Sequence, residues 1–120
     1  MDDLPIPNWE GFHPAHHYAP YRGKLMKTAL MEFSRTCPFD CGYCGNRILK
    51  ELYEKNGVKS IVRHKSPEKF IKDLKHLKDT YGIEFVSITD GTFLSFPDPV
   101  LEHLADLYIK EISLPFFVDS

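Results

Sequence analysis

The three cysteines of this chain, Cys37, Cys41 and Cys44, lie within one stretch of eight residues and follow the spacing C-x3-C-x2-C. In a helix these positions would merely share a face, but Pro38 and Gly42 stand between them. Inside a helix proline costs roughly 3 kcal/mol and glycine about 1 kcal/mol, so the stretch is predicted to be a loop. Three soft sulfur ligands on one loop indicate a single shared metal centre.

Thiolate sulfur selects zinc, copper(I) or an iron–sulfur cluster, and the spacing favours the cluster. Zinc sites commonly combine paired C-x2-C units, or cysteine with histidine, to reach four protein ligands. This chain has one C-x2-C pair, Cys41 and Cys44. Three ligands on a cluster of four irons would leave one iron without a protein ligand, and chemistry could occur at that iron.

The composition is that of one globular domain, with 120 residues of which 42% are hydrophobic and 27% charged. A net charge of −2, from 15 basic and 17 acidic residues, does not favour binding to nucleic acid or to a membrane surface. No window approaches the roughly 20 apolar residues of a membrane span, and the acidic start lacks the pattern of a signal peptide. Three clustered cysteines fit a reducing compartment, so a cytoplasmic location is expected.

The first part of the chain divides at the cysteine loop. Residues 1–23 are rich in proline, histidine and aromatic residues without a sustained period, so extended coil is expected there. Residues 27–33 are predicted to form a buried strand that leads into the loop. Residues 46–55 predict a short helix after the loop, closed by Asn56-Gly57.

Two longer helices carry start and stop signals. The first is predicted to begin at Ser66-Pro67 and to end at Gly82, and the second follows Asp98-Pro99. Each has one apolar stripe: Phe70, Ile71, Leu74, Leu77 and Tyr81 in the first, and Val100, Leu101, Leu104, Leu107 and Tyr108 in the second.

Strands are predicted over residues 84–89 and 114–118, so strands and helices alternate along the chain. This alternation is typical of right-handed parallel crossovers and predicts an α/β fold. Basic and acidic side chains alternate from Lys65 to Lys78, opposite the apolar stripe of the first long helix, and predict a solvated helix face.

Tyr43, directly before the last cysteine, completes a pattern that resembles the signature of the radical S-adenosylmethionine (radical SAM) enzymes. The resemblance implies a 4Fe–4S cluster held by Cys37, Cys41 and Cys44, with S-adenosylmethionine on the fourth iron and Tyr43 near its adenine. It further implies an electron donor such as flavodoxin or ferredoxin, and reductive cleavage of the cofactor to a 5′-deoxyadenosyl radical that removes a hydrogen atom from an unknown substrate.

The resemblance also implies a partial (β/α) barrel of about six units, with the cluster loop after the first strand. A full barrel of eight units takes roughly 250 residues, so this chain corresponds to about the first three units only. We expect residues 1–24 to be an extended linker and residues 25–120 to be a truncated core domain, a fragment of a larger enzyme. Its helices could cover one face of the sheet, and homo-association or a missing companion chain is expected to cover the other.

The N-terminal lead segment, residues 1–24, limits the resemblance to one group of radical SAM proteins. Asp2 to Trp9, followed by Phe12 and Tyr18, is similar to the linker that precedes the barrel in cobalamin-binding radical SAM proteins. The approach to the cysteines is also similar to theirs, except that Thr36 replaces the usual glycine before the first cysteine. No cobalamin-binding domain precedes the linker, so cobalamin binding in the manner of those proteins is not expected.

A second candidate site follows the predicted strand 84–89. In many radical SAM enzymes this strand ends in Gly-Gly-Glu, which meets the amino group of the cofactor; cobalamin-type relatives often carry an acidic pair and a phenylalanine there. Asp90 and Phe93 match that pattern, while Gly91 replaces the second acid. A carboxylate at the end of a strand can accept from an ammonium group, which makes Asp90 and Gly91 candidate cofactor-binding residues. The alternative is a simple Asp-Gly turn.

The remaining candidates are weaker. His13, His16 and His17 could bind a metal, but a solvated loop is favoured because no acid or thiolate lies near them in sequence. Arg35 could bring positive charge to the cluster or could be a surface residue. Two function classes remain: an iron–sulfur protein that cleaves S-adenosylmethionine, or a non-catalytic iron–sulfur or zinc module, including an inactive remnant.

Overall fold

The structure, a computed structural model, describes residues 1–59 and 62–119. Its centre is a four-stranded sheet in the order β1-β2-β5-β6, whose strands are Tyr18–Tyr21, Lys24–Met31, Phe85–Ile88 and Phe116–Val118. β2, β5 and β6 run parallel, with Met31 paired to Ile88 and Ile88 paired to Val118. The three predicted strands are therefore confirmed as parallel neighbours in sequence order.

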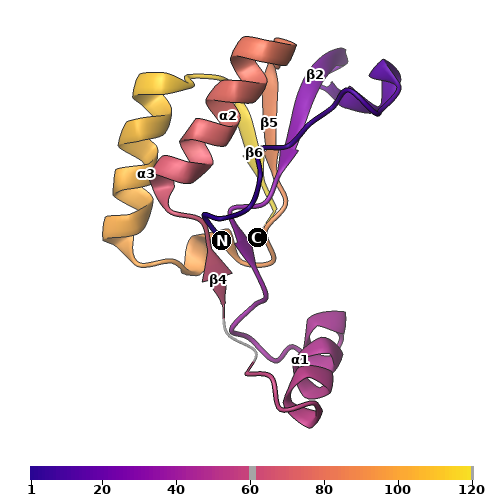
Figure 1. The fold of residues 1–120 in the computed structure, drawn as a ribbon, viewed down its shortest axis with the longest axis vertical. Helices are drawn as coiled ribbons and strands as arrows, with labels where there is room; N and C mark the ends of the chain where they lie inside the picture. Colours follow the sequence, from indigo (N-terminus) through magenta and orange to yellow (C-terminus); the bar gives the residue numbers. More distant parts are fainter. Residues whose placement is uncertain (60–61, 120) are drawn as a thin grey trace.

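Two helices, α2 (Pro67–Tyr81) and α3 (Asp98–Glu111), lie together on one side of this sheet (Figure 1). The Ser66 side chain accepts a hydrogen bond from the Lys69 amide at 3.2 Å, and Gly82 ends α2 with a left-handed φ of 65°. α3 begins one residue earlier than predicted. Asp98 is the first residue of α3 and not its cap. The Asp98 carboxylate therefore lies in the first turn, where its negative charge interacts favourably with the helix dipole.

The core lies between the sheet and these two helices. Phe33 is its centre, because its ring contacts Phe70, Phe93 and Phe96 with centroids 5.2 to 5.8 Å apart. The predicted stripe of α2 is buried except for Tyr81, while in α3 only Leu104 and Tyr108 are buried. This packing of two helices on a parallel sheet confirms the α/β class and is consistent with part of a (β/α) fold.

The opposite face of the sheet is covered only in part: Thr28 and Phe85 on this face are buried, and the ring of Tyr21 lies against Phe85. Leu30 in β2 is 66% exposed and Phe117 in β6 is 51% exposed, although both are large apolar residues in parallel strands. The one-sided helix cover that the sequence predicts is confirmed. In an ordinary parallel sheet both faces are buried, so the exposed part of this face is available for packing.

Residues 14–21 differ from the expected coil. A 3₁₀ turn (Pro14–His17) leads into β1, which pairs antiparallel with β2 so that Tyr21 lies opposite Lys24. Arg22 and Gly23 both have positive φ, 47° and 77°, and form a two-residue turn of the kind that matches strand twist. The expectation of coil is wrong here because the Arg-Gly signal for a hairpin lies at the edge of the proline-rich segment.

The first thirteen residues form no helix or strand and are bound to α2 at two places. Asp2 accepts the Ser66 amide at 2.8 Å, and hydrogen bonding with the side chain and then the amide of Ser66 lowers the pKa of Asp2. At the other end of α2, the Tyr81 hydroxyl accepts the Trp9 amide at 3.2 Å while their rings stack. The lead segment is thus extended but packed along α2.

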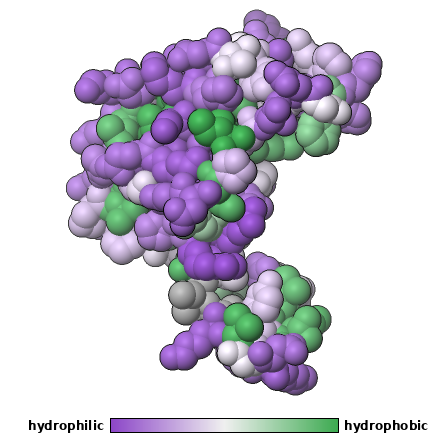
Figure 2. Space-filling view, in the orientation of Figure 1, coloured by the Kyte–Doolittle hydropathy of each residue, from purple (hydrophilic) through white to green (hydrophobic). Residues whose placement is uncertain are grey.

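The segment between β2 and α2 leaves the sheet. β3 (Ser34–Arg35) and β4 (Arg63–His64) form a short antiparallel pair that the sequence does not predict, and the predicted helix is present as α1 (Gly45–Lys55). α1 has no buried residue and projects from the body of the molecule (Figures 1 and 2). No helix in the described ranges is long and apolar enough to span a membrane.

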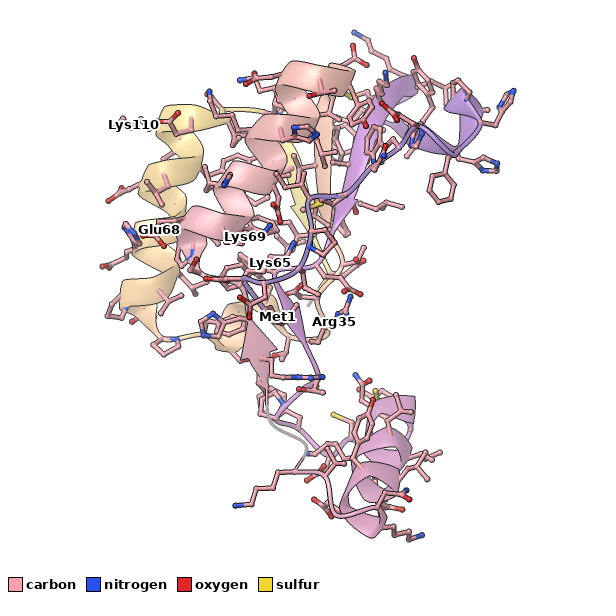
Figure 3. All side chains as sticks on the ribbon, viewed as in Figure 1. Met1, Arg35, Lys65, Glu68, Lys69 and Lys110 are labelled. Carbon is pink, nitrogen blue, oxygen red and sulfur yellow. The ribbon has the colours of Figure 1, made fainter. Side chains whose placement is uncertain are left out.

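The charged face of α2 contains a buried group. Asp73 is fully buried and accepts from Lys65 at 2.9 Å and from Lys69 at 2.6 Å. Figure 3 labels both lysines, Lys69 in α2 and Lys65 just before it. The prediction of a solvated face from Lys65 to Lys78 is therefore wrong at these three positions. The physical reason is that Asp73 lies three residues after Phe70, on the side of the helix that packs against the core.

Candidate metal centre

Residues 36–44 connect β3 to α1 and contain all three cysteines. They form neither helix nor strand, which confirms the predicted loop. Cys37 is buried, Cys41 is exposed, and Cys44 is half-buried at the residue before α1; none of the three forms a disulfide. The Cys44 amide donates to the Cys41 carbonyl at 3.1 Å, so a tight turn links the last two cysteines.

Thr36 places the first cysteine. Its φ of 71° lies in the left-handed region, which glycine adopts freely and which costs a β-branched residue conformational energy. A glycine before the first cysteine, as in the family pattern that Thr36 departs from, would suit this backbone without strain. Cys37, the next residue along the chain, is buried.

Asp90 follows β5 and lies beneath the start of this loop. It is 3% exposed, and its Oδ1 accepts the amides of Phe33 at 2.8 Å and Ser34 at 3.1 Å. Its Oδ2 accepts the Ser34 hydroxyl at 2.7 Å. A simple exposed turn does not describe this residue. The predicted contact of Asp90 with a cofactor stays a prediction.

Gly91 brings the end of β5 against the cysteine loop. A Cβ atom at Gly91 would lie 3.7 Å from the Cβ of Cys37 and 3.4 Å from the Nδ2 of Asn46. Gly91 does not have positive φ. Its lack of a side chain matters through this close approach, which places the predicted residues Cys37 and Gly91 side by side.

A cavity of about 200 Å³ opens beside Cys37. Three basic side chains line it, Arg35 from β3, Lys50 from α1 and Arg63 from β4. Lys50 is anchored there because it pairs with Asp40 and also donates to the Pro38 carbonyl at 3.3 Å. Arg35 pairs with Glu32 at 2.9 Å and still borders the cavity. Basic side chains therefore line the cavity that Cys37 borders.

Two predicted candidates lie apart from this cavity. Tyr43 is 94% exposed between Gly42 and Cys44, so its ring is available to a ligand on the open side of the loop. The three histidines of the lead segment pack locally: His17 stacks on Trp9 with centroids 4.0 Å apart, and His13 accepts the Ala15 amide at 3.3 Å.

Within residues 1–59 and 62–119, no three His, Cys, Asp or Glu side chains converge on a position for one metal ion. A cluster of four irons needs a different arrangement, because each thiolate binds its own iron atom. The donor chemistry fits such a cluster, since three free thiols share one loop with basic side chains beside it. Cys37, Cys41 and Cys44 are the residues that could hold it.

Comparison with protein families decides the class of the chain. The sequence model of the radical SAM superfamily matches residues 31–117, from the last residue of β2 into β6, and so includes the whole cysteine loop. The chain belongs to the radical SAM superfamily. Radical SAM proteins use S-adenosylmethionine and a 4Fe–4S cluster in general, so S-adenosylmethionine-dependent radical chemistry is the setting for this site.

One curated radical SAM relative is the anaerobic magnesium-protoporphyrin IX monomethyl ester cyclase of a Synechocystis species, which is 33% identical to this chain over 73 residues. The alignment covers 61% of this chain and 12% of that protein. No solved structure matches the chain.

Sequence reasoning missed the residues that support the radical SAM loop. The Ser34 hydroxyl donates to Asp90, and the Lys50 ammonium group donates to the Pro38 carbonyl of the loop. The side chain of Asn46 lies beside Gly91. Single polar residues of this kind carry no periodic signal. Ser34 lies in the approach to the cysteines, and Asn46 and Lys50 lie in the predicted helix 46–55, but the sequence predicts no contact for any of them.

Proposed function

We propose that this chain binds a 4Fe–4S cluster through Cys37, Cys41 and Cys44 and binds S-adenosylmethionine at the iron that these residues leave open. The observation that supports this proposal is that all the thiols of the chain lie on one loop that begins beyond the C-terminal end of β2. Parallel α/β folds collect their ligands at that edge of the sheet. When bound, the cluster would supply the electron for reductive cleavage of the cofactor to a 5′-deoxyadenosyl radical.

The side chains around the loop have separate roles in this proposal. Arg35, Lys50 and Arg63 offset the negative charge of thiolates and cluster, because they line the cavity beside Cys37. Tyr43 offers its exposed ring to the adenine of the cofactor. A flavodoxin or ferredoxin in the reducing cytoplasm is the proposed electron donor, and no substrate is assigned.

Anaerobic reconstitution with iron and sulfide tests the ligand set. We expect Cys37→Ala, Cys41→Ala and Cys44→Ala each to lose most of the iron, because a three-thiolate site has no spare ligand. Phe39→Ala is the matched control: this exposed side chain lies in the same loop but is not a proposed ligand, so its variant should keep the iron. Unchanged iron in all three cysteine variants would contradict the proposal, and tight zinc binding without iron would favour the structural module.

A further inference from the structure

Asp90 is a buried carboxylate that accepts its hydrogen bonds from two neighbouring residues, through two backbone amides and one hydroxyl. Phe33 and Ser34 donate three hydrogen bonds to it, of 2.7 to 3.1 Å. A carboxylate buried to this degree is tolerated only when it is well paired, and bonds to an ionised acceptor are stronger than neutral ones. The geometry is thus a specific clamp between the end of β5 and the end of β2.

The clamped residues are where the chain leaves the parallel sheet. Ser34 begins β3, and Cys37 follows three residues later. Phe33 is itself fixed, because its side chain is fully buried and its carbonyl accepts the Lys65 amide at 2.9 Å. On the other side of the clamp, Gly91 lies so close to Cys37 that a Cβ atom at Gly91 would be 3.7 Å from the Cβ of Cys37. Asp90 therefore joins a rigid core to the start of the cysteine loop from two directions.

We propose that Asp90 is a positioning residue: by holding the backbone of Phe33 and Ser34 it fixes Cys37 at the place of the first cluster ligand. This inference rests on the proposed function for the meaning of Cys37, but the placement itself concerns the protein alone. The role differs from contact with the cofactor. With three hydrogen bonds from Phe33 and Ser34 and 3% exposure, the carboxylate is already engaged in holding the start of the loop.

Alkylation of the cluster-free chain measures this placement without any cofactor. Mass spectrometry of the iodoacetamide adducts reports the rates of Cys37, Cys41 and Cys44 separately. We expect Asp90→Asn to raise the Cys37 rate about tenfold, since it removes charge-assisted bonds that keep the loop start closed, and to leave the exposed Cys41 unchanged. Ser34→Ala removes one of the three bonds and should give a smaller rise at Cys37. Asp106→Asn, an exposed carboxylate on α3, is the matched control and should change nothing.

The same variants, reconstituted with iron and sulfide, separate the possible failures. A shifted reduction potential of the cluster in Asp90→Asn without S-adenosylmethionine supports positioning, because a cofactor ligand would act only when the cofactor is present. An unchanged Cys37 rate, or an equal rise at all three cysteines with loss of the melting transition, would overturn the inference. The wild-type chain could take up no cluster while Asp90→Asn still raises the alkylation rate of Cys37. That result would refute the proposed function and support the positioning role of Asp90.

Discussion

Thr36 carries a conformational cost at the first residue of the cysteine loop. A left-handed backbone costs a non-glycine residue roughly 1–2 kcal/mol, while glycine adds entropy to the unfolded chain. We expect Thr36→Gly to raise the free energy of unfolding by roughly 0.5–1 kcal/mol after that entropy is counted. The urea midpoint of unfolding measures the change.

Thr80→Gly is the control for this substitution. Thr80 is an exposed residue in α2, where glycine should lower the free energy of unfolding by a few tenths of a kcal/mol. Opposite signs at the two positions would confirm that the backbone at residue 36 causes the gain. A loss of stability at both positions would show that the Thr36 side chain contributes more than its backbone costs.

A second prediction for a single residue concerns Tyr43. Its ring is 94% exposed beside the last cysteine, and a stacking contact with adenine is worth about 0.5–1.5 kcal/mol. Tyr43→Ala should therefore weaken S-adenosylmethionine binding several-fold and leave the iron content unchanged. Phe39→Ala, which removes another exposed ring of the same loop, should leave the cofactor affinity unchanged. Equal loss of iron and cofactor in Tyr43→Ala would make Tyr43 a structural residue.

The buried carboxylate of Asp73 in α2 neutralises two lysines, Lys69 in the same helix and Lys65 just before it. Lys65 and Lys69 have side chains only 8% and 12% exposed, and both donate to Asp73. Removing one partner from such a group leaves buried charge unpaired, so Asp73→Ala should cost roughly 3–5 kcal/mol of unfolding free energy. Denaturant unfolding measures this cost.

Asp79→Ala in the same helix is the comparison. Asp79 is exposed and lies 3.8 Å from Lys75, and such surface pairs contribute about 0–1 kcal/mol. A loss in Asp73→Ala no larger than in Asp79→Ala would mean that Lys65 and Lys69 reach solvent when Asp73 is absent.

The elements that the sequence predicts are those with a local chemical cause. Ser66 and Gly82 mark the ends of α2 because a cap and a left-handed residue are properties of the chain itself. The two-residue strands β3 and β4 have no period to detect, and their pairing depends on a distant contact. Asp90 resembles a turn residue in sequence for the same reason, since its partners lie 56 and 57 positions away.

The whole molecule leaves apolar surface uncovered on several sides. A groove of about 370 Å³ beside α3 and β6 is lined by residues such as Leu94, Ile109 and Phe116. α1 exposes the apolar residues Ile48, Leu49 and Leu52, which appear as a hydrophobic patch in Figure 2. Contiguous apolar surface of this kind is uncommon on a monomer.

We therefore expect the isolated chain to show a mass that rises with concentration in analytical ultracentrifugation. Ile109→Lys in the groove and Leu49→Lys on α1 place a charge on each surface in turn, and the variant that restores the monomer identifies the surface involved. A wild-type chain that stays monomeric and melts sharply at all concentrations would contradict this expectation.

The central claim is that the three cysteines hold a cluster with one iron open to S-adenosylmethionine. The most direct measurement is the electron paramagnetic resonance spectrum of the reconstituted, reduced chain, recorded with and without the cofactor. We predict the signal of a reduced 4Fe–4S cluster whose g values shift when S-adenosylmethionine is added, because the cofactor changes the coordination of one iron. A cluster signal that the cofactor leaves unchanged would show a closed site and contradict the account.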